Sequence, residues 1–283
     1  MTKTLFISDL DGTLLSSGGR LSATTVSLLN HAISRGALFS VATARTPATV
    51  SVLLKDVDVR IPLVVMTGGA LWDMRTGRYS EVQYFDPAQI EGIVDTYVQA
   101  GGGAFLYTLP RAAEGDRDIF EIYHIGEMTP VESEFMRERI DSPFKVFHVD
   151  AGGNSLLPET IDDAVLFFGM QPAAVGADIY GRLKVIPRIN PMIYHDWHGP
   201  EVAEIEAFPA TTTKAQGIKR LARLVGADRV VVYGDNVNDL SMMAVADWAV
   251  AVGNAVPEVK EAAVEVIGTN DADAVARHIL ESL

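Results

Sequence analysis

Short apolar runs alternate with longer, mixed segments along the first part of the chain. The runs Lys3–Ser8, Ala37–Ala42 and Ile61–Met66 each have the length and composition of a buried strand. Ser22 can cap a helix between the first two runs, and Gly36 can end that helix. This alternation predicts parallel βαβ units whose helices cover both faces of one sheet.

The pattern changes in the middle of the chain, where several short strands are predicted with few helices between them. Leu71–Trp72 and Arg78–Phe85 flank a predicted hairpin turn. Further strands are expected at Ala104–Tyr107, Ile119–Ile125, Phe144–Val149 and Ala164–Phe168, and helices near Asp86–Val98, Thr129–Ile140 and Pro172–Leu183. The doubly wound pattern is expected to return at about Glu201, followed by a helix over Lys214–Val225 and a buried strand over Arg229–Tyr233.

This order of elements predicts an α/β fold. The core is a doubly wound, Rossmann-like parallel sheet, and a smaller α+β domain is inserted into it. We expect residues 1–85 and 191–283 to form the core and residues 86–190 to form the inserted domain. In a doubly wound sheet, ligands bind beyond the carboxyl ends of the strands. The functional residues are therefore expected at that edge.

Charge and composition narrow the classes of partner. The chain has 283 residues, with 37 acidic against 23 basic side chains and a net charge of −14. This charge opposes non-specific binding to nucleic acid or to an anionic membrane. An anionic substrate therefore needs a local positive group, such as a metal ion. Because the chain has no cysteine, disulfides, thiolate metal sites and cysteine nucleophiles are excluded.

The sequence also bears on where the protein works. No uninterrupted apolar run approaches the roughly 20 residues that a membrane span needs. Met1–Lys3 leads straight into the first predicted strand, so no signal peptide is expected. We therefore predict a cytoplasmic protein, a monomer or weak homo-oligomer that binds neither membranes nor nucleic acid.

Four groups of polar residues follow predicted strands or open predicted helices. They are Asp9, Asp11 and Thr13; Thr43; Lys214; and Asp235, Asn238 and Asp239. Each group alone is compatible with an ordinary turn, cap or solvated side chain. Their joint placement at one edge of the sheet favours a shared site.

The chemistry of these side chains fits phosphoryl transfer with a divalent cation. Carboxylates are the hard oxygen ligands that Mg²⁺ prefers, and three are available: Asp9, Asp235 and Asp239. A carboxylate can also attack phosphorus and form an aspartyl-phosphate, which splits hydrolysis into two steps. The neighbouring Asp11 can protonate the leaving alcohol and then deprotonate water. Thr43 and Lys214 can hold the phosphoryl oxygens.

These motifs resemble those of a known superfamily. The order Asp9-Leu-Asp11-Gly-Thr13, Thr43, Lys214 and Gly234-Asp235-x-x-Asn238-Asp239 is similar to the four motifs of the haloacid dehalogenase (HAD) superfamily. The long insert between the second and third motifs resembles the cap of the Cof-type (type IIB) phosphatases. Residues 86–190 are accordingly expected to determine substrate specificity.

The resemblance implies a role for each motif residue. Asp9 is the nucleophile and Asp11 the acid/base, while Thr43, Lys214 and Asn238 are the phosphate-binding residues. The Mg²⁺ site comprises Asp9, Asp235, Asp239 and the backbone carbonyl of Asp11, and Asn238 helps to organise it. The expected reaction is hydrolysis of small phosphorylated metabolites, such as sugar phosphates or phosphorylated cofactors.

The chain departs from the family pattern at three places. Relatives usually have Thr-Gly-Arg where this chain has Thr43-Ala44-Arg45, and Asn-Gly-Ala where it has Gly68-Gly69-Ala70. Glycine often follows the lysine, whereas Ala215 does here. No catalytic group is removed. Arg45 is left as a candidate phosphate contact.

Two other functions stay open at this point. A sugar phosphomutase shares the nucleophile and the cap type, although hydrolysis needs only water as the acceptor. A non-catalytic regulator that binds a phosphorylated metabolite is expected to lack a catalytic residue, and here all are present.

Overall fold

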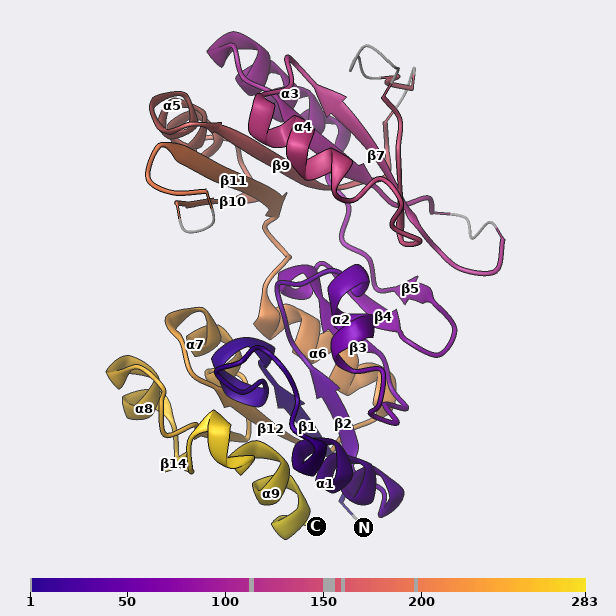
Figure 1. Cartoon of the computed structure of the whole chain (residues 1–283), viewed down its shortest axis with the longest axis vertical. Coiled ribbons are helices and arrows are strands. Elements are labelled where there is room, and N and C mark those ends of the chain that lie inside the picture. The colour runs from indigo at the N-terminus through magenta and orange to yellow at the C-terminus, as the bar shows by residue number, and fades with distance from the viewer. Residues whose placement is uncertain (1, 112–114, 150–155, 159–160, 196–197) are drawn as a thin grey trace. The chain divides into compact units, whose positions relative to one another are not determined.

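The computed structural model describes residues 2–111, 115–149, 156–158, 161–195 and 198–283. The chain divides into two compact units. Unit 1 comprises Met1–Glu81 and Thr213–Leu283, and unit 2 comprises Val82–Thr212. Figure 1 shows both units, which are described separately below.

Unit 1 is built on a five-stranded parallel sheet with the order β14-β13-β12-β1-β2. The strands are β1 (Thr4–Ser8), β2 (Leu38–Val41), β12 (Arg229–Gly234), β13 (Trp248–Ala251) and β14 (Glu265–Val266). The central pair is in register, with Ser8 opposite Tyr233. The residues that follow β1 and β12 therefore emerge side by side at the same edge of the sheet.

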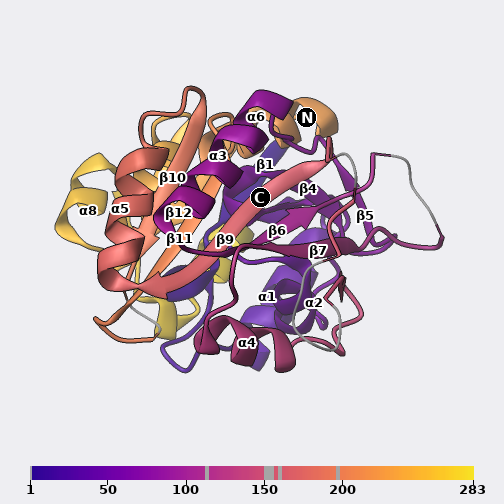
Figure 2. The same cartoon turned by 90° about the horizontal axis from the view of Figure 1, so that it is seen from above.

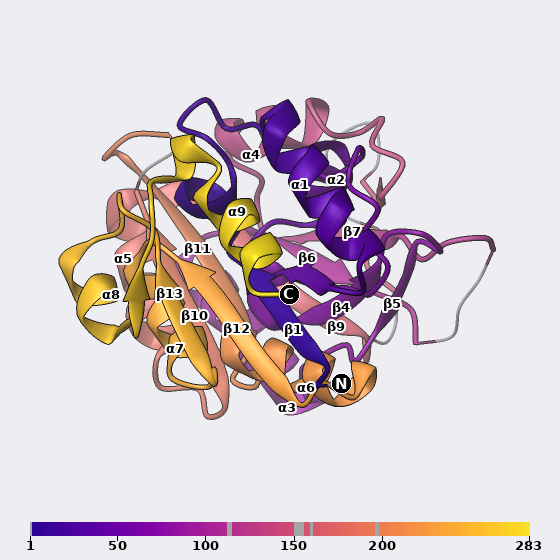
Figure 3. The same ribbon diagram turned by 90° about the horizontal axis from the view of Figure 1, so that it is seen from below.

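Helices cover both faces of this sheet, as the apolar runs predict. Figure 3 shows α1 (Ala23–Ser34) and α9 (Ala274–Glu281) on one side of the strands, and α6 (Lys214–Val225) and α7 (Leu240–Met243) on the other. Unit 1 also contains the short α-helices α2 (Pro47–Leu53) and α8 (Pro257–Ala262). Because both faces are covered, every side chain of Leu5–Ile7 is fully buried.

A small antiparallel sheet lies beside the parallel one. It consists of β3 (Leu63–Val65), β4 (Ala70–Asp73) and β5 (Arg78–Ser80), in that order. A parallel bridge between Ala42 and Val64 connects the end of β2 to β3. The predicted hairpin is present, but its second strand ends at Ser80 and not at Phe85.

Unit 2 contains a six-stranded sheet with the order β10-β11-β9-β6-β7-β8, antiparallel except for the pair β7–β8. Its strands are β6 (Ala104–Thr108), β7 (Phe120–Ile125), β8 (Lys145–Phe147), β9 (Ala164–Pro172), β10 (Ile189–Tyr194) and β11 (Val202–Pro209). Its helices are α3 (Pro87–Ala100), α4 (Pro130–Arg137) and α5 (Ala173–Leu183). The sheet lies between α3 and α5 on one face and α4 on the other (Figure 2).

Successive side chains of a strand point to opposite faces of the sheet, so both faces of this sheet can be apolar. Leu106 and Phe167 join the buried cluster that α3 and α5 cover. Their neighbours Phe105 and Phe168 point the other way, where each packs against Phe135 of α4.

The predicted end of the inserted domain needs a correction. From the sequence, residues from 191 onward are expected in the core, with the doubly wound pattern returning at about Glu201. Instead, β10 and β11 pair antiparallel within the sheet of unit 2, and the chain re-enters unit 1 at Thr213. The sequence of β11 alternates buried Ala203, Ile205 and Ala207 with two glutamates. This period of two is typical of an antiparallel strand.

Within the described part of the chain, no helix is long and apolar enough to cross a membrane.

Two helical glycines, one in a crowded place and one in open space, give a matched test of how closely α6 packs in unit 1. A Cβ atom on Gly217 of α6 would lie 2.4 Å from Cγ1 of Val64 and 2.9 Å from Cα of Gly68. The same atom on Gly181 of α5 would meet nothing within 4 Å. We expect Gly217→Ala to destabilise the protein by about 1–3 kcal/mol through overpacking. Gly181→Ala should stabilise it by about 0.5–1 kcal/mol because alanine is the better helix former.

Thermal and urea unfolding of both variants, followed by circular dichroism, measure this difference. A Gly217→Ala variant at least as stable as the wild type contradicts the close approach of α6 to Gly68.

Candidate active site

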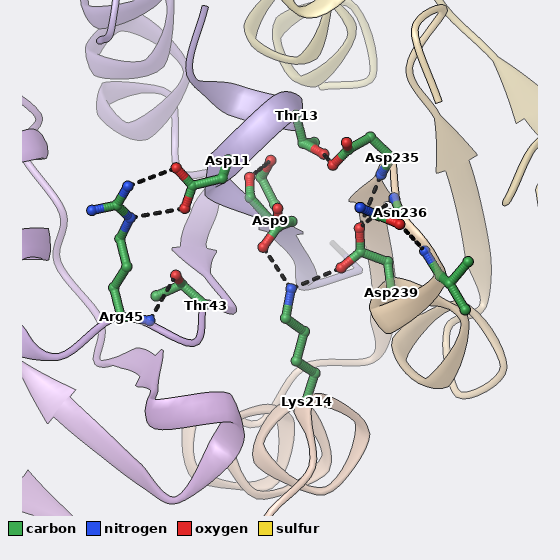
Figure 4. Close-up of polar contacts among 11 residues, drawn as sticks. Asp9, Asp11, Thr13, Thr43, Arg45, Lys214, Asp235, Asn236 and Asp239 are labelled. Carbon is green, nitrogen blue, oxygen red and sulfur yellow. Dashed lines mark hydrogen bonds and ion pairs between the residues drawn. The ribbon is translucent and has the colours of Figure 1, made fainter. Parts of the chain in front are cut away.

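Four separate segments bring polar side chains to the carboxyl edge of the parallel sheet (Figure 4). Asp9 directly follows β1, and its backbone N–H donates to the carbonyl of Tyr233, 2.9 Å away. Asp235 directly follows β12, Thr43 lies two residues after β2, and Lys214 is the first residue of α6. The candidate site lies entirely within unit 1.

An ammonium group bridges two carboxylates at the centre of the site. Lys214 Nζ lies 2.5 Å from Asp9 Oδ1 and 2.7 Å from Asp239 Oδ1. The side chains of Lys214 and Asp239 are only 2% and 0% exposed. Burial lowers the pKa of Lys214, but the two carboxylates raise it by more, so the pKa ends above its ordinary value.

The turn Leu10–Leu14 brings the backbone against Asp235. Gly12 has φ +79°, and a Cβ atom there would lie 2.4 Å from Asp235 Oδ2. Both the backbone angle and the lack of space therefore require glycine at this position. Thr13 Oγ1 donates to Asp235 Oδ1 over 2.7 Å. On the outer side of the turn, Asn254 Nδ2 donates to the carbonyl of Gly12 over 2.7 Å. Asp235 is thereby tied to the chain segment that carries Asp9.

The turn after β12 is organised by Asp239. Its Oδ2 accepts hydrogen bonds from the backbone N–H groups of Asp235 and Asn236, at 2.9 and 3.1 Å. Asn236 caps the following helical turn, and its side chain accepts from the N–H of Val237. Asn238 is exposed.

Three carboxylates lie close together in this site, and Lys214 donates to two of them. Ligand atoms of Asp9, Asp235 and Asp239 all lie within 4.8 Å of one another. Burial raises the pKa of Asp9 to about 7, against an attraction to Lys214 that lowers it. Burial also raises the pKa of Asp235, and its proximity to Asp239 adds to the effect. The negative charge therefore exceeds what Lys214 neutralises.

This donor set fits a magnesium ion. The three groups are hard oxygen donors close enough to share one cation. A divalent cation would offset the surplus negative charge that burial makes costly. The structure thus brings together the three side chains from which the sequence analysis predicts a Mg²⁺ site.

Asp11 lies in a different environment from Asp9, although only one residue separates them. Its side chain is 54% exposed and accepts two hydrogen bonds from Arg45, from Nε at 2.8 Å and from Nη2 at 2.7 Å. The backbone N–H of Arg45 also donates to Thr43 Oγ1 over 3.1 Å. The hydroxyl proton of Thr43 is left to donate to an incoming oxygen. Arg45, a candidate phosphate contact by sequence, pairs here with Asp11.

Sequence reasoning missed two residues that shape the site. Asn236 occupies the cap position beside Asp239, and Asn254 holds the Gly12 turn. Asn254 follows β13 at the same carboxyl edge as the motif residues, so the rule that located those residues also points to it. The cap position of Asn236 depends on backbone angles that the sequence does not specify.

Comparisons with known proteins agree with this architecture. A family model described as haloacid dehalogenase-like hydrolase matches residues 6–150 and 188–279. The 5-amino-6-(5-phospho-D-ribitylamino)uracil phosphatase YwtE of Bacillus subtilis (strain 168) is 26% identical over 284 residues, which cover 96% of this chain and 95% of YwtE. The pyridoxal phosphate phosphatase YbhA of Escherichia coli (strain K12) is 44% identical over 70 residues, 23% of this chain and 26% of YbhA.

Solved structures show the same fold over the whole chain. A haloacid dehalogenase-like hydrolase from Bacteroides thetaiotaomicron superposes with a TM-score of 0.73 at 22% identity, covering 99% of each chain. A HAD subclass IIB sugar phosphatase superposes with a TM-score of 0.66 at 18% identity, also covering 99% of each chain. The predicted fold class, a doubly wound α/β core with an inserted domain, is confirmed.

The raised pKa of Asp9 predicts how stability depends on pH without metal. The folded state holds the Asp9 proton up to about pH 7, whereas the unfolded chain releases it near the ordinary value of 3.8. This residue's contribution to stability is therefore lost as the pH rises from about 4 to 7. In EDTA, we expect the Tm of Asp9→Asn to rise relative to that of the wild type as the pH increases from 5 to 8. Mg²⁺ should raise the wild-type Tm more at pH 8 than at pH 5.

Differential scanning calorimetry across this pH range measures both effects. A Tm difference between the two proteins that stays constant from pH 5 to pH 8 in EDTA is incompatible with an elevated Asp9 pKa.

Proposed function

Because the chain belongs to the haloacid dehalogenase-like hydrolases, we propose that it is a Mg²⁺-dependent phosphatase of small phosphorylated metabolites that works through an aspartyl-phosphate. Within that superfamily it is a Cof-type phosphoric monoester hydrolase. The observation that carries the proposal is the buried contact of Lys214 with Asp9 and Asp239, beside the carboxylate of Asp235.

In the first step, an oxygen of Asp9 forms a bond to phosphorus while the bond from phosphorus to the ester oxygen breaks. Asp11 gives a proton to that oxygen, which leaves as an alcohol. In the second step, Asp11 takes a proton from water as the water oxygen attacks the phosphorus of the aspartyl-phosphate. Inorganic phosphate leaves, and the Asp9 carboxylate is restored. Two hydrogen bonds from Arg45 hold the exposed Asp11 side chain in place.

The remaining groups bind and orient the phosphoryl oxygens. The Lys214 ammonium is next to Asp9 and so is placed to contact an oxygen of the group that Asp9 attacks. Thr43 offers its hydroxyl proton, and we assign Asn238 to the same set as a group exposed at the rim.

Mg²⁺ would be held by the carboxylates of Asp9, Asp235 and Asp239 and by the backbone carbonyl of Asp11. When bound, it supplies positive charge that offsets the carboxylates and polarises the phosphoryl group. Thr13 fixes the orientation of Asp235 for this purpose.

Unit 2 is proposed as the cap that selects the substrate. The catalytic groups all belong to unit 1 and act on the phosphoryl group, which every phosphate monoester has. Selection among esters therefore needs contacts from elsewhere, and binding energy from the non-reacting part of a substrate also raises kcat. YwtE is named for a phosphorylated ribitylamino-uracil, YbhA for pyridoxal phosphate and a structural neighbour for sugar phosphates. These names support small phosphorylated metabolites as the substrate class.

The proposal is tested with purified protein and a panel of phosphate monoesters. We expect phosphate release that EDTA abolishes and Mg²⁺ restores, with kcat/KM varying strongly across the panel. Asp9→Asn should abolish turnover while the circular dichroism spectrum stays unchanged, because the amide keeps the shape of the side chain but is not a nucleophile. Metal-independent phosphate release, or an active Asp9→Asn variant, excludes this mechanism.

The leaving group distinguishes the role of Asp11 from that of Asp9. A general acid contributes about 10²–10⁴-fold when the leaving alcohol needs a proton. Asp11→Asn should therefore lower kcat by about this factor for an alkyl phosphate, and by much less for p-nitrophenyl phosphate, whose leaving group is stable as an anion. Steady-state kinetics on both esters measure the ratio. Equal losses on the two esters argue against proton transfer by Asp11.

A further inference from the structure

We propose that Arg220, a buried residue of α6, is a positioning residue that fixes the distance between Thr43 and Lys214 through the backbone loop Met66–Gly68. The inference rests on the proposed function, because it concerns the groups assigned to the phosphoryl oxygens.

The loop Met66–Gly68 has an unusual backbone. Its three residues have consecutive positive φ angles of +52°, +54° and +90°. Methionine and threonine are disfavoured in this region, and a β-branched residue such as Thr67 is a marked outlier there. Strained backbone of this kind persists only where surrounding contacts hold it, and it concentrates at functional sites.

One side of the loop is bonded to the segment that carries Thr43. The N–H of Thr67 donates to the carbonyl of Thr43 over 2.9 Å. The N–H of Met66 donates to the carbonyl of Arg45 over 3.1 Å. The loop therefore determines where the backbone of Thr43 and Arg45 lies.

The other side of the loop abuts the start of α6. A Cβ atom on Gly68 would lie 2.1 Å from the carbonyl oxygen of Thr213 and 3.3 Å from the backbone nitrogen of Lys214. Gly217, one turn further along α6, approaches the Cα of Gly68 closely enough that its own Cβ would lie 2.9 Å from it. The loop is thus in van der Waals contact with the backbone that carries Lys214.

Arg220 holds the loop in this position. Its Nη2 donates to the carbonyl of Gly68, and the residue is buried. Arg220 lies three residues after Gly217 and so shares the helix face that packs on the loop. A buried guanidinium that donates to a neutral carbonyl is costly to desolvate, and in the described residues its Nε has no hydrogen-bond partner.

These contacts connect two functional side chains that come from different elements. Thr43 follows β2 and Lys214 begins α6, and Figure 4 shows them on separate segments of the site. If the Arg220 bond is lost, the strained loop can relax to ordinary backbone angles, and the two side chains move relative to each other. A misplacement of about 1 Å can cost roughly 100-fold in rate.

Arg220→Met tests the inference, since it keeps the aliphatic stem and removes the donor. Arg223→Met is the matched control, because Arg223 is an exposed residue of the same helix and its loss changes the charge equally. We expect Arg220→Met to lower kcat for p-nitrophenyl phosphate by about 10- to 100-fold and to weaken inhibition by inorganic phosphate. Its half-saturating Mg²⁺ concentration should change less than its inhibition by phosphate, because Asp9 and Asp235 follow β1 and β12, whereas the loop follows β3. Arg223→Met should match the wild type in all three.

The three readouts distinguish positioning from general loss of structure. Arg220→Met kinetics equal to those of Arg223→Met overturn the inference. So does an equal weakening of phosphate and Mg²⁺ binding, which indicates a general loss of structure in the site. If the wild type and Arg223→Met release no phosphate from any ester, the proposed function fails instead.

Thr67→Gly decides the matter if Arg220→Met does not fold. Glycine adopts φ near +54° without strain, so this variant should keep a wild-type Tm while the loop becomes freer to move. A folded Thr67→Gly variant with lowered kcat and weaker phosphate inhibition supports the inference. A folded variant with wild-type values for both overturns it.

Discussion

The Lys214 ammonium lies between carboxylates from two different strand ends, and the rest of the site depends on this contact. Without the ammonium, Asp9 and Asp239 would be two buried negative charges in direct proximity, which is strongly unfavourable. The contact is possible only because β1 and β12 are adjacent and in register and because α6 begins at the same edge. The topology of the parallel sheet is therefore a precondition for the chemistry.

The charge balance of the site also explains how so acidic a protein can bind an anion. The chain carries a net charge of −14, and a phosphate monoester is itself negative. Lys214 brings one positive charge to a cluster of three carboxylates, and burial still raises the pKa of Asp9 to about 7. A divalent cation would leave Lys214 with charge to spare for a phosphoryl oxygen. If the proposed Mg²⁺ binds here, substrate binding and metal binding would be linked through this charge balance.

The sequence predicts the parts of this structure that follow from local rules. Parallel strands end at one edge, so the placement of Asp9 and Asp235 together could be predicted from two apolar runs and the polar residues after them. The prediction that places Val202–Pro209 in the core is wrong, because strand partners are set by tertiary packing, although the period-two pattern of this strand is typical of an antiparallel sheet. The positive φ angles of Met66 and Thr67 oppose local preference, so no local rule predicts them. The pairing of Arg45 with Asp11 joins residues from two loops and is likewise visible only in the folded chain.

Burial separates the chemistry of two neighbouring aspartates. Asp9 is enclosed beside Lys214, so in the proposed mechanism its attacking oxygen would be shielded from water. Asp11 is half exposed, and Arg45 holds it by both oxygens, so in the proposed mechanism it lies open to solvent and to the leaving alcohol. The turn at Gly12 reverses the backbone immediately after them and allows one short segment to present both groups. In the proposed mechanism, a strand that ends in a tight turn thus supplies the nucleophile and the acid/base within three residues.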